Sequence, residues 1–339
     1  MRQLMMREPG RLDWAEAPEP DLQGPLEALV RPLAVASCDL DGPIVRGEAP
    51  IPGPIALGHE CVGRVCAVGS AVTRFTEGDV VVVPFQISCG SCARCRAGLT
   101  GNCQTVPERS MFGFGALGGD WGGMLSDLIR VPFADAMLVE APAGLDPTAI
   151  ASASDNIPDA WRTVAPHLAA MPGEEVLVLG GGARSISLYA VGIALALGAR
   201  RVTYLDGDPG RLALASDLGA EAIEGPAPYR MEHSYAIVLD GGASRETLAC
   251  ACRSTAPGGH CTHVGILYEP ETPVPLLEMY STGVNLHVGR AMARADIPAV
   301  LALIAGGAFD PARVTDRVLP FAEAQAALLE PHTKLVFTG

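Results

Sequence analysis

Two different rhythms of hydrophobic and polar positions divide the chain. In the first part, short β-branched runs at 61–68 and 79–84 alternate with turns rich in glycine and proline. This pattern predicts short strands in an antiparallel, barrel-like domain, because glycine and proline mark the turns between strands. The same rhythm resumes near the end of the chain, where 317–320 and 335–337 are predicted strands and 322–329 is a predicted helix.

The middle of the chain carries apolar runs without alternation. Helix-like stretches such as 211–218 separate four of these runs, at 176–179, 202–206, 235–240 and 263–267. Strands that are apolar on both faces and separated by helices predict a doubly wound parallel sheet. We therefore expect an α/β chain with a β-rich domain at 1–156, a parallel-sheet domain at 157–291, and a return to the first domain at 292–339.

Composition and charge narrow the class of protein. The chain has 24 Lys and Arg against 38 Asp and Glu, a formal net charge of −14. Nucleic acids and anionic membranes bind clustered cations, so we expect neither as a partner. The longest apolar stretch, 188–197, has about half of the ~20 residues that a membrane span needs, and the N-terminal residues lack a signal-peptide pattern. We expect a cytoplasmic protein whose ten cysteines are thiols or metal ligands.

Four of those cysteines crowd into one glycine-rich loop. Cys89, Cys92, Cys95 and Cys103 follow the spacing Cys-x2-Cys-x2-Cys-x7-Cys. Four thiolates can fill every position around one tetrahedral zinc ion, at about 2.3 Å each. The loop therefore predicts a structural zinc site that leaves no position for a substrate.

The segment 180–185 has the features of a dinucleotide-binding loop. It follows an apolar run and opens a helix-like stretch. Gly180 supplies a tight turn and Gly182 lets a pyrophosphate approach backbone N–H groups, while Ser185 stands in place of the third glycine. Asp206 ends the next apolar run, where an acid binds the ribose 2′-hydroxyl and repels a 2′-phosphate. The pattern favours NAD(H) as the cofactor.

Two arginines bear on that preference. Arg184 lies inside the loop and Arg211 lies a few residues after Asp206. Either arginine would reverse the preference if it held a 2′-phosphate. Arg184 has two further interpretations: a solvated or phosphate-facing side chain, or an anchor for a substrate carboxylate or phosphate.

A second metal site is predicted from residues that are far apart in the sequence. Cys38 and His59 lie at turns between predicted strands, and Asp155 lies near the domain boundary. Three protein ligands leave an open position on zinc for water or a carbonyl oxygen, as a catalytic zinc site requires. Glu60 is an alternative or outer-sphere ligand, and Asp41 is placed to orient His59.

The order and spacing of these motifs resemble the zinc-containing medium-chain alcohol dehydrogenase superfamily. The resemblance rests on Cys38-Asp39-Leu40-Asp41, Gly58-His59-Glu60, the four-cysteine loop, the 180–185 loop and Asp206. The segment 154–161 is most similar to the formaldehyde-dehydrogenase branch, in which Asp replaces the usual second Cys on zinc.

The resemblance implies a GroES-like catalytic domain, a Rossmann domain and a cleft between them. It also implies one structural and one catalytic zinc, a homodimer or homotetramer, and hydride transfer between NAD(H) and a small-molecule alcohol or carbonyl substrate. Lys334, the only lysine, falls where the family often has a basic residue near the pyrophosphate.

Three positions depart from the family pattern. Leu40 replaces the Ser or Thr whose hydroxyl passes the alcohol proton toward solvent, and it cannot carry a proton. Arg184 replaces an apolar residue, and Asp159 replaces a Thr that often touches the cofactor. These departures keep two alternatives open: a reductase of an activated C=C or C=N bond, and a catalytically silent protein that binds NAD(H) or zinc.

The remaining histidines show no ligand-like spacing. Two of them, His260 and His263, lie near a predicted strand, where we expect them to flank the cofactor sheet rather than bind metal. The others are His167, His233, His287 and His332.

Overall fold

The computed structural model describes all residues, 1–339, and divides the chain into two compact units. The first unit comprises 1–158, 291–307 and 315–339, and the second comprises 159–290 and 308–314. These boundaries fall within two residues of those expected at 156/157 and 291/292. The difference is the short segment 308–314, which belongs to the second unit rather than to the first. One reason is Phe309, whose ring lies against Gly192 of a helix in that unit.

The first unit is built on a seven-stranded sheet and a smaller three-stranded sheet. The larger sheet has the order β15-β16-β3-β5-β6-β8, with β7 paired to β3, and the smaller has the order β2-β1-β4. Only β15 and β16 are parallel neighbours. The strands are β1 (Arg2–Glu8), β2 (Arg11–Glu16), β3 (Ala28–Ala36), β4 (Ile55–Ala56), β5 (Glu60–Val68), β6 (Val80–Val83), β7 (Ile129–Val131), β8 (Val139–Glu140), β15 (Arg317–Pro320) and β16 (Leu335–Thr338).

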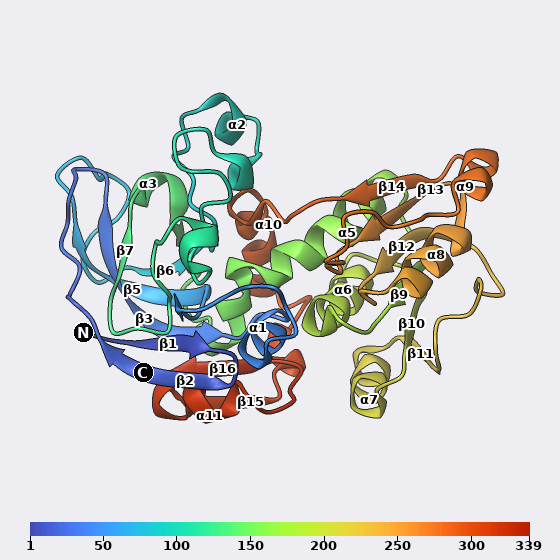
Figure 1. Cartoon of the computed structure of the whole chain (residues 1–339). Coiled ribbons are helices and arrows are strands. Elements are labelled where there is room, and N and C mark those ends of the chain that lie inside the picture. The colour runs from blue at the N-terminus through green and yellow to red at the C-terminus, as the bar shows by residue number, and fades with distance from the viewer. The chain divides into compact units, whose positions relative to one another are not determined.

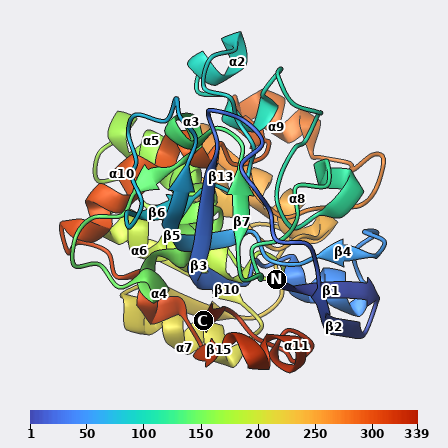
Figure 2. The same cartoon turned by 90° about the vertical axis from the view of Figure 1, so that its left-hand side faces the viewer.

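Helices connect these strands, and all of them except α10 are short. The α-helices are α1 (Asp41–Arg46), α2 (Ala93–Arg96), α3 (Ala134–Met137), α4 (Pro147–Ile150), α10 (Ala293–Ala305) and α11 (Ala324–Ala327), and the 3-10 turns are η1 (Thr100–Asn102), η2 (Gly115–Gly118), η3 (Ala151–Ser154) and η5 (Phe321–Glu323). In Figures 1 and 2 the loop that carries α2 projects from the rest of this unit. A projecting loop of polar and glycine residues has little apolar surface to bury, so it needs another source of stability.

The second unit is a six-stranded sheet in the order β11-β10-β9-β12-β13-β14, and every neighbouring pair is parallel. All four residues of β9 are fully buried, because helices cover a parallel sheet on both faces. The strands are β9 (Val176–Leu179), β10 (Val202–Asp206), β11 (Glu221–Glu224), β12 (Tyr235–Asp240), β13 (Thr255–His263) and β14 (Asn285–Val288), and the helices are α5 (Asn156–Ala170), α6 (Arg184–Ala196), α7 (Pro209–Leu218), α8 (Arg245–Ser254), α9 (Leu276–Thr282) and the 3-10 turn η4 (Pro311–Val314). Figure 1 draws β11 and β14 at the two edges of the layer.

One predicted strand is wrong. The apolar run 263–267 is not a strand, because β13 spans Thr255–His263 and ends where its neighbours β12 and β14 end. Its first half contains Pro257, Gly258 and Gly259, residue types that weaken strands and mark turns. Partner strands on both sides overcome that poor intrinsic preference, which the sequence pattern does not reveal.

No helix of the structure combines the length and the apolar character that crossing a lipid bilayer would require.

Candidate metal centres and nucleotide-binding loop

Strand pairing in the first unit brings the predicted catalytic ligands together. Ala36 at the end of β3 lies opposite Glu60 at the start of β5, so the residues just beyond both positions share one end of the sheet. Cys38 follows β3 and His59 precedes β5, while Asp155 ends the turn η3. The ligand atoms of these three residues and of Glu60 all lie within 4.8 Å of one another, and all four residues are buried.

Gly58 is needed to present His59 at this corner. Its backbone has φ +90°, a conformation that favours glycine. A Cβ atom at this position would lie 2.6 Å from the backbone nitrogen of Leu125. The Gly-His-Glu sequence therefore has a steric cause as well as a chemical one.

The side chains in this cluster leave hydrogen-bonding capacity unused. The Cys38 thiol lies 3.4 Å from Asp155 Oδ2 and 3.3 Å from Asn156 Oδ1, and His59 Nε2 lies 3.5 Å from Asp155 Oδ2. The His59 side chain is 1% exposed, and neither ring nitrogen has a hydrogen-bond partner. Buried polar atoms without partners are rare and call for an explanation. A zinc ion held by Cys38, His59 and Asp155 supplies one, because zinc accepts this donor set.

The electrostatics of the cluster also call for a cation. Burial, reinforced by the carboxylates of Asp155 and Glu60, raises the pKa of the Cys38 thiol well above its usual value. Burial lowers the pKa of His59, but the nearby carboxylates, Asp41 first among them, outweigh it and raise that pKa to about 9. Negative charge in a place that water does not reach contributes to both pKa shifts. A divalent ion would neutralise this charge and allow Cys38 to bind as a thiolate.

Glu60 is held by the only lysine in the chain. Lys334 Nζ lies 3.0 Å from Glu60 Oε2 and also donates a hydrogen bond to the carbonyl oxygen of Ser37. Both side chains are fully buried. Burial raises the pKa of the Glu60 carboxyl, and the Lys334 ammonium opposes that rise. We expected Lys334 near the pyrophosphate of the cofactor; in the structure its amine contacts Glu60 of the metal cluster. Glu60 Oε1 has no hydrogen-bond partner.

Asp41 lies beside His59 and also fixes the backbone at Cys38. One carboxylate oxygen accepts a hydrogen bond from the Cys38 backbone N–H at 2.8 Å, and the other lies 3.7 Å from His59 Nδ1. The second distance is longer than a hydrogen bond. Asp41 therefore holds the turn after β3 and leaves its other oxygen facing the imidazole.

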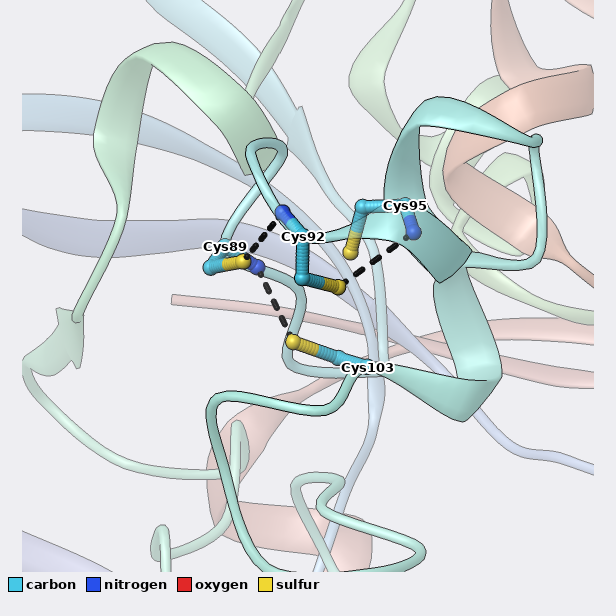
Figure 3. A group of neighbouring side chains, drawn as sticks. All are labelled: Cys89, Cys92, Cys95 and Cys103. Carbon is cyan, nitrogen blue, oxygen red and sulfur yellow. Dashed lines mark hydrogen bonds between the residues drawn. The ribbon is translucent and has the colours of Figure 1, made fainter.

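The second metal cluster lies in the projecting loop. Figure 3 shows the sulfurs of Cys89, Cys92, Cys95 and Cys103 pointing toward one another, and all lie within 4.8 Å of one another. Backbone N–H groups donate to three of the sulfurs: Cys92 N to Cys89, Cys95 N to Cys92 and Cys89 N to Cys103, each at 3.4 Å. Such N–H···S bonds favour the thiolate form, which is the form that binds zinc.

The surroundings of Cys89 prepare it to ionise. Burial raises the pKa of its thiol, but hydrogen bonds from the hydroxyls of Thr105 and Ser91 and from the Cys92 backbone outweigh that effect and lower the pKa to about 5. The Thr105 hydroxyl lies 3.1 Å from the Cys89 sulfur. The loop thus fits the four-thiolate zinc site expected from its spacing.

The predicted nucleotide-binding loop joins β9 to α6. Gly180 follows β9, and α6 begins at Arg184, so the loop has the strand-turn-helix setting that a dinucleotide fingerprint requires. A Cβ atom on Gly180 would lie 2.3 Å from Asp206 Oδ2, and one on Gly182 would lie 2.6 Å from the Cβ of Ala243. Ser185 is fully buried at the third position.

Asp206 is engaged within the protein. Its Oδ2 accepts hydrogen bonds from the Tyr204 hydroxyl at 2.7 Å and Arg211 Nε at 2.8 Å. Its Oδ1 accepts hydrogen bonds from the Asp208 backbone N–H at 3.0 Å and Arg211 Nη2 at 2.8 Å. A carboxylate has about four acceptor positions, so all of them are in use. A ribose hydroxyl that bound Asp206 would have to displace one of these donors, and Arg211 is the cation beside that carboxylate.

Several residues at these sites were missed by sequence reasoning. Asn156 lies beside Cys38 although an amide is not a usual zinc ligand, and only its position next to Asp155 pointed to it. Asp159, expected near the cofactor, forms an ion pair with Arg162 in the structure. The remaining histidines were expected to show no ligand-like pairing, apart from His260 and His263 near a strand. In the structure one ring nitrogen each of His167, His260 and His287 lies within 4.8 Å of the other two, although the spacing in the sequence gave no signal.

Comparisons with known proteins agree with this arrangement. Residues 24–143 match the alcohol dehydrogenase GroES-like domain family, and residues 185–306 match the zinc-binding dehydrogenase family. These matches confirm the predicted pairing of a GroES-like domain with a Rossmann-type parallel sheet.

Individual relatives cover the whole chain or large parts of it. A probable zinc-binding alcohol dehydrogenase of Mycobacterium tuberculosis is 30% identical over 329 residues, 96% of this chain and 83% of that protein. A glutathione-independent formaldehyde dehydrogenase of Pseudomonas aeruginosa is 33% identical over 226 residues, 63% of this chain and 56% of the relative. The solved structure of an alcohol dehydrogenase from Thermus sp. ATN1 has a TM-score of 0.90 and 31% identity, with 100% of this chain and 99% of that chain covered.

Proposed function

Because the chain belongs to the zinc-containing medium-chain alcohol dehydrogenase superfamily, we propose that it is an NAD-dependent oxidoreductase that interconverts an alcohol and a carbonyl compound. The observation that carries this proposal is the buried cluster of Cys38, His59 and Asp155, in which a His59 nitrogen has no partner. Assembly as a homodimer or homotetramer is part of the same proposal.

Charge balance supports the assignment of ligands. Cys38 as a thiolate and Asp155 as a carboxylate carry two negative charges, which match one divalent ion. Glu60 and Lys334 form a separate pair beside them. A zinc ion bound there would act as a Lewis acid toward the substrate oxygen. Lys334 keeps Glu60 engaged, so Glu60 is an outer residue of this site in the proposal.

In the proposal, Asp41 holds the metal ligands in place, and the 180–185 loop and Asp206 bind the cofactor. Asp41 fixes the backbone of Cys38 through its hydrogen bond, and backbone N–H groups of the 180–185 loop, at the N-terminus of α6, would receive the pyrophosphate. The nicotinamide would carry the hydride. The negative charge of Asp206 supports NAD over NADP, with Arg211 as the group that opposes this preference.

A second candidate function has one observation in its favour. Leu40, immediately before α1, has no hydroxyl to pass on a proton and lies two residues from Cys38. A reductase of an activated C=C or C=N bond would not need that relay. Asp39 and water are the alternative proton carriers in the alcohol–carbonyl reaction.

Zinc content and turnover together test the proposal. We would measure zinc per chain and NAD-linked activity on a panel of alcohols, aldehydes, ketones, enals and imines. The proteins are wild type, Cys38→Ala and the matched control Cys250→Ala, which removes a buried thiol outside the clusters. If the proposal is correct, Cys38→Ala should contain one zinc fewer per chain and lose alcohol–carbonyl turnover, while wild type and Cys250→Ala keep both. Equal zinc in all three proteins, with turnover confined to enals or imines, would favour the reductase.

A further inference from the structure

Three histidines from separate elements meet in the second unit. His167 lies in the last turn of α5, His260 in β13 and His287 in β14. One ring nitrogen of each lies within 4.8 Å of a ring nitrogen of the other two. None of them contributes to the two metal clusters of the first unit or to the 180–185 loop.

The register of the sheet explains how two of these rings meet. In the parallel pair β13–β14, His260 lies opposite Asn285 and Thr262 lies opposite His287. Residues two apart on a strand share a face, so His260 and His287 are diagonal neighbours on one face of the sheet. His260 Nδ1 and His287 Nε2 are 2.9 Å apart and share a hydrogen bond, which a bound metal ion would replace.

The third ring closes the cluster from α5. The ring centroid of His167 lies 4.3 Å from that of His260 and 5.0 Å from that of His287, and the latter two centroids are 5.1 Å apart. Zinc–imidazole bonds of about 2.0–2.1 Å in a tetrahedron separate the nitrogens by roughly 3.3 Å. The rings are now stacked or tilted, so rotation about side-chain bonds is the change that would aim three nitrogens at one centre.

The charge around the cluster is compatible with a bound cation. The nearby cation Arg162 is paired with Asp159 and donates a hydrogen bond to the carbonyl oxygen of Gly289, so its charge is partly balanced.

A buried polar atom on the same strand face points the same way. Thr262, two residues after His260, is 1% exposed, and its hydroxyl has no hydrogen-bond partner. Strand alternation places it on the face that carries His260. Buried hydroxyls are normally satisfied by protein or by an ordered polar group.

We propose that His167, His260 and His287 bind a divalent transition-metal ion of the class that prefers imidazole, such as Zn²⁺ or Ni²⁺. Three neutral ligands leave the ion its double charge and one open tetrahedral position, which water or a small anion fills. This would be a third metal site of the chain, in the unit that carries the nucleotide-binding loop.

The test counts metal on the intact protein. Wild type, His260→Gln, His287→Gln and the control His233→Gln are loaded with excess Zn²⁺, passed through gel filtration and analysed for zinc per chain. His233 is exposed and outside the cluster. Wild type and His233→Gln should retain one zinc more than the two cluster variants. Equal zinc content in all four proteins overturns the proposal.

Two additions keep the result interpretable. The same histidine variants are also made in the Cys38→Ala protein, which separates this ion from the proposed catalytic zinc. The zinc lost through Cys38→Ala and the zinc lost through a histidine variant should add, because the two sites are independent. Thermal unfolding with added Ni²⁺ provides a second readout, because an ion that binds only the folded protein raises the unfolding temperature. Ni²⁺ should stabilise wild type and His233→Gln but not folded His260→Gln or His287→Gln. An equal shift in every protein contradicts the site.

Discussion

The amine of Lys334 lies 3.0 Å from a carboxylate oxygen of Glu60, and neither side chain has any exposed surface. The two residues come from β5 and from the segment just before β16, strands that both pair with β3. A buried charge depends on its oppositely charged partner for stabilisation, because water cannot reach it and take the partner's place.

Replacing Lys334 with Met should therefore destabilise the first unit strongly. Removal of one partner of a buried pair costs about 3–5 kcal/mol, and urea unfolding measures the change in free energy. The double variant Glu60→Gln/Lys334→Met should recover part of that loss. Arg317→Met breaks the exposed Arg317–Glu330 pair and should change stability by less than about 1 kcal/mol. Equal losses in the buried and the exposed variants would contradict the role of burial.

Substitution of Gly180 by Ala should disturb the loop between β9 and α6. The new Cβ would meet the Asp206 carboxylate and the Tyr204 hydroxyl, both closer than 3.0 Å. We expect NADH affinity to fall at least about tenfold, a change of roughly 1.4 kcal/mol, as measured by calorimetric titration. Gly207→Ala is the control, because its Cβ meets nothing within 4 Å. Unchanged NADH binding in Gly180→Ala would argue against a nucleotide at this loop.

Cofactor preference should depend on the pairing of Asp206 with Arg211. Asp206→Ala releases the Arg211 guanidinium and removes the negative charge, so NADPH binding should improve relative to NADH. A charge-assisted hydrogen bond contributes about 1.5–3 kcal/mol, so the ratio of the two affinities should shift by roughly ten- to a hundredfold. Adding Arg211→Ala to that variant should abolish the gain. A wild-type protein that already prefers NADPH would overturn the proposed preference for NAD.

The carboxylate of Asp206 should also affect the stability of the folded protein at acidic pH. Burial raises the pKa of Asp206, but hydrogen bonds from Arg211 and Tyr204 outweigh it and leave the pKa below the usual value of 3.8. A carboxyl whose pKa is lowered by folding stabilises the protein above its unfolded pKa, and that contribution is lost as the pH falls below it. Between about pH 5 and about pH 3, wild type should therefore lose stability more steeply than Asp206→Asn in urea unfolding. Parallel curves would show that the shift is absent.

Removal of one thiolate from the projecting loop should release its metal. Cys103→Ser should contain one zinc fewer and unfold at a lower temperature, because the loop buries few apolar residues of its own and relies on the ion. Elemental analysis and thermal unfolding measure the two effects. Cys66→Ser, a cysteine of β5 outside the clusters, should keep both values. A full zinc content in Cys103→Ser would exclude a four-cysteine site.

Local patterns predicted much of this molecule. The strands at 176–179, 202–206, 235–240 and 317–320 have the expected bounds. In the first three, the apolar run coincides with a buried strand, whereas 317–320 is a largely exposed strand. The grouping of the four loop cysteines was also predictable, since ligands a few residues apart in a loop have little freedom to separate. Cys38, His59 and Asp155 were predicted from motifs whose order and spacing resemble a known family.

Contacts that depend on strand register or on long side chains were not predictable in this way. Arg211 reaches Asp206 from the following helix, and Lys334 reaches Glu60 across a sheet, so both arginine and lysine appeared available for the cofactor. The three clustered histidines come from a helix and two strands, and no spacing rule connects them. For Lys334 and the three histidines, the partner is determined by pairing between elements that lie far apart in the sequence. Arg211 meets Asp206 because the chain turns back from β10 into α7.

The hydrogen bond from Arg162 to the carbonyl oxygen of Gly289 has a consequence for the order of folding. The large sheet of the first unit pairs Ala36 with Val336, so its closure must bridge everything between them. Bringing together distant chain segments carries an entropic penalty that grows with the length of the flexible link. When the second unit folds first, residues 162 and 289 are already in contact. The chain between Ala36 and Val336 then behaves as a much shorter flexible link. Early folding of the inserted unit should therefore accelerate the completion of the sheet into which β16 is added.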